Sequence, residues 1–190
     1  MTTPADTEQT ADASTLGARH RGREVALQVL YAIDLYAIGR RDARIARSEG
    51  DGARDAPAPP LGEIPPIEVA SLPDDPVDAA ALVFDRVTDH FDVPRSAVAF
   101  ARALVTDVAR SGEALDEIIG LHARNWRVSR MAAVDRNVLR LAVYELRDTE
   151  TPVPVVIDEA VDLARRFGSD TSPSFVNGVL DAVAREVRAA

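Results

Sequence analysis

The chain has no cysteine, no lysine, few aromatic residues and no long apolar run. Without cysteine it has no disulfide, no thiolate metal ligand and no cysteine nucleophile. No apolar stretch approaches the roughly 20 residues that a membrane span needs, and the start lacks the charged-then-apolar pattern of a secretory signal. We therefore expect a cytoplasmic protein without a membrane segment. Because every basic residue is arginine, each cationic side chain offers a planar fork that can grip phosphate with two hydrogen bonds.

Charge is distributed unevenly along the chain. The formal net charge of -9 argues against a surface that coats nucleic acid broadly. Between Ala18 and Arg47, however, seven arginines face three acidic residues, a local charge of +4. Between Asp55 and His90, eight acidic residues accompany one arginine, a local charge of -7. A small basic site on an acidic body is typical of a short, selective RNA contact.

Two stretches fall outside any periodic pattern. Residues 1–17 are rich in Thr, Ala and Asp and are expected to form a disordered tail. Residues 18–190 are expected to form a single helical domain, since this length favours one core. An acidic insertion rich in proline and glycine interrupts that domain at about residues 48–75, where proline removes backbone donors. Its role is open: it is a surface loop, or an autoinhibitor that folds over the basic arm.

Helical periodicity dominates the rest of the chain, and no segment alternates with period two for long. Asp75 before Pro76 and Ser172 before Pro173 are start signals, and Gly168 is a stop signal. We expect an all-α fold, a compact bundle of about seven helices. The expected helices cover residues 21–38, 75–91, 94–110, 113–123, 134–147, 155–167 and 172–187, with a short turn beginning at Ser129.

Three blocks in the last fifty-odd residues are too particular in composition to be generic helix. They read VDRNVLRLAVYEL over 134–146, VVIDEAVDLA over 155–164 and FVNGVLD over 175–181. With the arginine cluster at residues 19, 21 and 23, in that order along the chain, they resemble the NusB family of bacterial transcription antitermination factors. The resemblance covers residues 18–38 and about 82–188, and its last two blocks are the most specific.

The resemblance implies a NusB-like fold of two packed helical subdomains and a non-enzymatic role without a cofactor. Such a protein would bind the boxA RNA of ribosomal RNA leaders together with the small-subunit ribosomal protein NusE. It would suppress termination within an RNA polymerase complex that holds other Nus factors. Docking of the partner would complete the RNA site, so RNA affinity should be modest without it.

The basic arm is the candidate RNA site. A cationic arm at a helix start, where free backbone N–H groups and the helix dipole add positive potential, favours an anion. The alternative is a solvated basic flank, and for the tyrosine of this segment a place in the core is slightly preferred. The candidate RNA-binding residues are Arg19, His20, Arg21, Arg23, Gln28 and Tyr31.

The candidate partner surface follows from the resemblance. Asp135 also suits the first turn of a helix through the helix dipole, and Phe175 could equally be core at i, i+4 from Val179. Thr171 stands where many family members carry an acid, so the polar contact differs here. Gly178, costly in a helix, is interpreted as a close helix contact. The candidate partner-binding residues are Asp135, Arg136, Asp170, Ser172 and Phe175.

No pattern indicates catalysis or a metal. His20, His90 and His122 have no spacing that places two on one helical face, so no zinc site is expected. The acidic face at 158–162 is interpreted as solvated, and Trp126 as a plug between helix groups. NusB-like domains also occur fused to ribosomal RNA cytosine methyltransferases, but this chain lacks the cysteine nucleophile and the cofactor domain. The remaining alternative is a helical protein-interaction module without RNA binding, and the sequence is compatible with a monomer or a homodimer.

Overall fold

The computed structural model describes residues 17–36, 72–90, 93, 95–124 and 126–187. Residues 1–16 of the expected tail and 48–71 of the expected insertion lie outside the described residues. The described part contains six α-helices, one short 3-10 helix and no strand, which confirms the all-α prediction. After an N-terminal helix that covers residues 17–36, the order is α2 (Pro76–His90), α3 (Arg95–His122), η2 (Val128–Arg130), α4 (Ala133–Asp148), α5 (Val153–Phe167) and α6 (Ser172–Val187).

Local signals set the helix starts where they are strong. The carboxylate of Asp75 accepts hydrogen bonds from the backbone N–H groups of Val77 at 2.9 Å and Asp78 at 3.0 Å, so it caps α2 as expected. The two helices predicted on either side of Ser111 and Gly112 are instead one continuous helix, α3. A glycine costs a helix only about 1 kcal/mol, which burial of residues on both sides offsets. Leu104 and Val108 before the pair, and Leu115 and Ile119 after it, are all buried.

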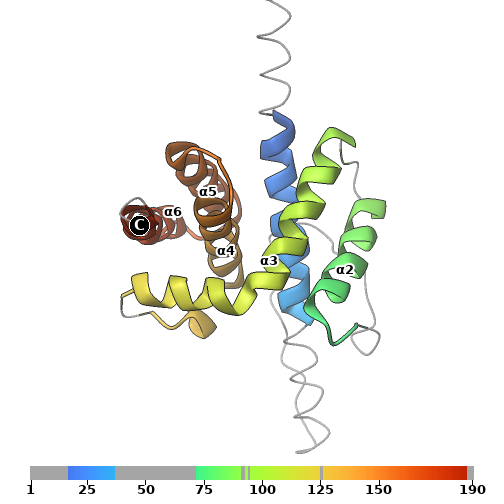
Figure 1. Ribbon diagram of the computed structural model, residues 1–190, viewed down its shortest axis with the longest axis horizontal. Helices are drawn as coiled ribbons and strands as arrows, with labels where there is room; N and C mark the ends of the chain where they lie inside the picture. The colour runs from blue at the N-terminus through green and yellow to red at the C-terminus, as the bar shows by residue number, and fades with distance from the viewer. Residues whose placement is uncertain (1–16, 37–71, 91–92, 94, 125, 188–190) are drawn as a thin grey trace, which may run out of the picture.

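Helix α3 joins two groups of helices (Figure 1). Its first half lies beside the N-terminal helix and α2, and α4, α5 and α6 lie on the other side. Its packing against α2, α4 and α6 gives one continuous core that extends across both groups. Fully buried side chains from both groups of helices meet in this core, and the removal of each from water contributes roughly 1.5–3 kcal/mol to the free energy of folding. The largest of them are Phe84, Leu27, Leu115, Ile119, Leu139, Leu141 and Leu180.

A partly buried ion cluster ties the end of the N-terminal helix to α4 and α3. The carboxylate of Asp34 accepts hydrogen bonds from the Arg136 guanidinium at 2.7 and 3.1 Å and from the Asn137 amide at 2.9 Å. Arg140 reaches the same carboxylate at 3.4 Å and pairs with Asp116 of α3 through two bonds of 2.7 Å. Burial disfavours the charge on Arg140, but the two carboxylates outweigh it and raise its pKa.

The turn between α5 and α6 is held by serine hydroxyls. Ser172 was expected to cap α6, but its Oγ accepts a hydrogen bond from the backbone N–H of Ser169 at 2.9 Å. Gly168 ends α5 with extended backbone, not the left-handed conformation typical of a stop glycine. It is needed for space, because a Cβ there would lie 2.6 Å from the Ala164 carbonyl oxygen and from Ser172. The interpretation of Gly178 as a close contact was wrong: a Cβ there would meet nothing within 4 Å.

Among the described residues, no helix has the length and apolar character to cross a membrane.

Candidate nucleic-acid and protein interfaces

The N-terminal helix presents the first part of the basic arm at the surface. Arg19 is exposed, and its guanidinium lies 5.6 Å from the centre of the Phe100 ring of α3. Gly22 allows the Phe100 ring to lie this close to the N-terminal helix, since a Cβ at position 22 would lie 2.6 Å from Cδ1 of the ring. His20 and Arg21 are half-buried; His20 points toward Glu159 of α5 and Arg21 toward Glu24. The structure therefore brings the first three arm residues together at one end of the N-terminal helix.

Arg23 differs from its neighbours because its side chain is buried. Its guanidinium donates two hydrogen bonds to the carboxylate of Glu145 in α4, at 2.8 and 2.7 Å. A carboxylate oxygen of Glu159 in α5 lies 3.6 Å from the remaining guanidinium nitrogen of Arg23. The centre of the Phe100 ring is 5.3 Å from the guanidinium carbon. A buried charge is tolerated only when it is paired and hydrogen-bonded, and Arg23 meets both conditions.

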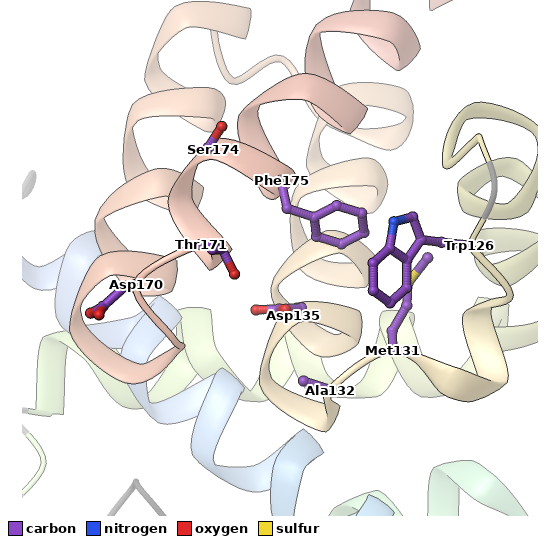
Figure 2. Close-up of a pocket in the computed structure, with 8 residues that line it drawn as sticks. All are labelled: Trp126, Met131, Ala132, Asp135, Asp170, Thr171, Ser174 and Phe175. Atoms are coloured by element: carbon purple, nitrogen blue, oxygen red, sulfur yellow. The ribbon is translucent and has the colours of Figure 1, made fainter.

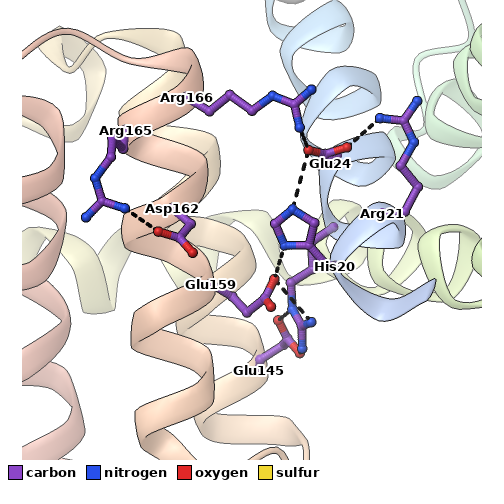
Figure 3. Close-up of polar contacts among 9 residues, drawn as sticks. His20, Arg21, Glu24, Glu145, Glu159, Asp162, Arg165 and Arg166 are labelled. Carbon is purple, nitrogen blue, oxygen red and sulfur yellow. Dashed lines mark hydrogen bonds and ion pairs between the residues drawn. The ribbon is translucent and has the colours of Figure 1, made fainter. Parts of the chain in front are cut away.

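Three carboxylates from three helices surround the arm (Figure 3). His20 bonds Glu159 of α5 at 2.9 Å, and its second ring nitrogen lies 3.5 Å from Glu24 on its own helix. Glu24 in turn forms ion pairs with Arg21 and with Arg166 from the end of α5. The acidic face of α5, predicted to be solvated, thus contributes Glu159 to the arm.

The last two RNA candidates lie further along the same helix. Gln28 is half-buried and Tyr31 is buried. Burial raises the pKa of the Tyr31 hydroxyl, because the charged phenolate would lose its hydration. The structure places Tyr31 in the hydrophobic core, as the alternative for that residue expected.

A second surface opens at the start of α4 and α6, around a pocket of about 550 Å³. Figure 2 shows the rings of Trp126 and Phe175 side by side at one edge, and their centroids are 5.7 Å apart. Asp135 lines the pocket, and its Oδ1 is buried without a hydrogen-bond partner among the described residues. The full lining is Trp126, Met131, Ala132, Asp135, Asp170, Thr171, Ser174 and Phe175.

Three of the five candidate partner residues meet at this pocket, namely Asp135, Asp170 and Phe175. The other two do not line it. Arg136 points to the ion cluster around Asp34, and Ser172, the first residue of α6, is buried against the turn from α5.

Sequence reasoning missed several residues of both surfaces. Trp126 was expected to plug a junction, but its side chain is 55 % exposed and lines the pocket, together with Met131. On the basic side the missed residues are Phe100 and Arg166. The buried pair of Glu145 with Arg23 was also missed, although the sequence held a signal for it. Glu145 lies on the apolar stripe of α4, and a charged residue on a buried stripe implies a buried cation beside it. For Arg166 no local signal existed, since its partner is 142 residues away.

The fold and these two surfaces define an all-α protein with a basic, acid-anchored cluster at one helix end and a partly apolar pocket elsewhere. The sequence model of the NusB family matches residues 72–185. The transcription antitermination protein NusB of Anaeromyxobacter dehalogenans (strain 2CP-1) is 40 % identical over 167 residues, which cover 87 % of this chain and 89 % of that protein. The protein of the same name from Sorangium cellulosum is 37 % identical over 173 residues, 90 % of this chain and 95 % of that one.

Solved structures show the same similarity. NusB of T. maritima superposes with a TM-score of 0.62 at 27 % identity, covering 88 % of this chain and 91 % of that chain. A structure of antitermination factors NusB and NusE in complex with double-stranded RNA superposes with a TM-score of 0.61 at 25 % identity, covering 89 % and 97 %. The chain belongs to the NusB family of transcription antitermination proteins, which are not enzymes.

Proposed function

We propose that this protein acts in the cytoplasm as an adaptor that binds boxA RNA of ribosomal RNA leaders together with the ribosomal protein NusE. The complex would join RNA polymerase with other Nus factors and suppress termination. The observation that carries the proposal is the exposed cationic end of the N-terminal helix, where Arg19, His20 and Arg21 lie together on an otherwise acidic protein. A structure of NusB and NusE with RNA among its structural neighbours supports the same assignment.

The basic cluster suits phosphate recognition more than base recognition. Arg19 and Arg21 keep guanidinium donors at the surface, and phosphate contacts position a protein on nucleic acid without reading its sequence. Arg23 fixes the position of Arg19 and Arg21, because its buried pair with Glu145 holds the N-terminal helix against α4. RNA binding by the free protein is therefore expected to be modest and sensitive to salt.

The pocket beside α4 and α6 is the proposed NusE surface. Aromatic side chains contribute strongly to protein interfaces, and the exposed Trp126 and the half-buried Phe175 supply two of them. The carboxylate of Asp135 has an oxygen in need of a donor, which an N–H or cationic group of the partner would provide. NusE binding and RNA binding would then be coupled, since NusE and the RNA would each contact this protein and would also contact each other.

Fluorescence anisotropy of labelled boxA RNA tests the proposal, with a scrambled RNA of the same length as control. We expect selective binding that tightens when NusE is added. Equal binding of both RNAs, or no effect of NusE, would contradict it. Absence of RNA binding with retained NusE binding would indicate the alternative function, a protein-interaction module.

A further inference from the structure

Arg166, on the last turn of α5, lies outside the basic arm but shares a carboxylate with it. Both Arg166 and Arg21 form ion pairs with Glu24, one guanidinium on each carboxylate oxygen. The Glu24 side chain is 2 % exposed, whereas those of Arg21 and Arg166 are 36 % and 58 % exposed. A buried carboxylate thus holds two solvent-facing guanidinium groups next to each other, from helices far apart in the sequence (Figure 3).

The arrangement leaves donor capacity on both arginines. A guanidinium has five N–H donors, and Glu24 uses one nitrogen of each. Among the described residues, no second hydrogen-bond acceptor is found for either group. Arg166 is further restrained by the Phe167 ring, whose centre lies 5.0 Å from its guanidinium carbon. Restraining a long side chain in advance lowers the entropy lost when it binds a ligand.

We propose that Arg21 and Arg166 form a two-pronged clamp for a single phosphate of the bound RNA, with Glu24 as the residue that positions both arginines. Planar guanidinium groups bind phosphate oxygens in bidentate geometry. Two of them beside the Glu24 carboxylate leave a net charge of +1, which matches the single negative charge of a phosphodiester. The clamp would extend the RNA path from the N-terminal helix onto α5. This inference rests on the proposed RNA-binding function, because it assigns a further residue to the same ligand.

The neighbouring residue provides a matched control. Arg165 carries the same charge on the same helix turn, and its side chain is 63 % exposed. It forms an ion pair with Asp162 of its own helix, away from Glu24. Replacing either arginine by glutamine removes one positive charge from the end of α5. A purely long-range electrostatic effect would therefore be similar for Arg165→Gln and Arg166→Gln.

The test is an anisotropy titration of boxA RNA with the full chain over a range of salt concentrations. For Arg166→Gln we expect about tenfold weaker binding, the loss of one charge-assisted contact. The slope of log affinity against log salt should fall by about 0.7, as for one single-strand phosphate. Arg165→Gln should leave both nearly unchanged. In the double variant with Arg21→Gln, the second loss should be smaller than the first, because the two side chains share one phosphate.

Equal affinities for the Arg165 and Arg166 variants would overturn the clamp, and so would additive losses in the double variant. Wild-type protein that binds no RNA, with or without NusE, would instead overturn the proposed function itself. Thermal unfolding of each variant serves as the folding control. Because Arg166 is mostly exposed and the buried Glu24 keeps Arg21 and His20 as partners, the single replacement is expected to leave the protein folded, with only a small shift in its melting temperature.

Discussion

Arg23 of the N-terminal helix and Glu145 of α4 are 122 residues apart in the sequence and form a two-bond ion pair inside the protein, at 2.8 and 2.7 Å. Both side chains are buried, so neither charge can be solvated if its partner is removed. The pair fastens the end of the basic arm to α4.

Replacement of Arg23 by alanine should destabilise the protein by about 3–5 kcal/mol, the usual cost of leaving one charge of a buried pair alone. Arg19→Ala, at an exposed site on the same helix, should change the free energy of unfolding by less than about 0.5 kcal/mol. Urea unfolding measures both. The double variant Arg23→Leu/Glu145→Met should recover most of the loss, because no charge is then left unpaired. A double variant as unstable as Arg23→Ala would show that packing, not the lost charge, explains the effect.

Tyr144 should make stability depend on pH in the alkaline range. Burial, and then the hydrogen bond and negative charge of Asp107, raise the pKa of Tyr144 to about 12. Because the folded state holds this proton more tightly than the unfolded chain, the contribution is complete below about pH 10 and is lost as pH rises toward 12. The chain has no lysine and no cysteine, so tyrosines dominate side-chain titration in this window.

Ultraviolet absorbance of tyrosinate during a pH titration reports the ionisation of all three tyrosines, and its difference between the wild type and Tyr144→Phe gives the titration of Tyr144. Asp107→Asn should lower the pKa of Tyr144 but leave it above 10, since burial remains. Tyr144→Phe should lose less stability between about pH 10 and about pH 12 than the wild type does. An unchanged titration curve in Asp107→Asn would contradict the assigned contribution of that carboxylate.

Trp126 should contribute more to partner binding than another exposed apolar side chain does. Under the proposed function, Trp126→Ala should weaken NusE binding by about thirtyfold, as expected for an aromatic residue at the centre of an interface. Leu121→Ala is the matched control, because Leu121 is also a large apolar side chain, 76 % exposed, and does not line the pocket. Calorimetry with NusE measures both affinities. Similar losses for the two variants would exclude the pocket as the docking site.

Two glycines should respond to alanine in opposite directions. Gly178→Ala should stabilise the protein by about 0.5–1 kcal/mol, since a helix interior favours alanine and a Cβ would meet nothing within 4 Å. Gly168→Ala should destabilise it by about 1–3 kcal/mol, because the Cβ would lie 2.6 Å from Ala164 and Ser172 atoms. Thermal unfolding distinguishes the two, and a stabilising Gly168→Ala would show that the turn before α6 adjusts freely.

The helices themselves could be predicted wherever the signals were local. Asp75 starts α2 by accepting hydrogen bonds from backbone N–H groups two and three positions along, so a few neighbouring residues are sufficient to predict this start. Ser111 and Gly112 misled the prediction, because their weak local preference for a break was outweighed by burial of Leu104, Leu115 and Ile119, which only the folded core provides.

The two candidate surfaces divide in the same way. The sequence by itself determined the helical class, the family and the arginine-rich arm, since these depend on periodicity and on blocks read in order. Only the tertiary structure decided what each arginine does. Arg21 and Arg23 are two positions apart on one helix, so they point in different directions, one to solvent and one toward α4. Arg21 pairs with Glu24 three positions along its own helix, which a local pattern can suggest. The contacts of Glu24 with Arg166 and of Arg23 with Glu145 were made by helix packing across more than a hundred residues, a distance that no local pattern spans.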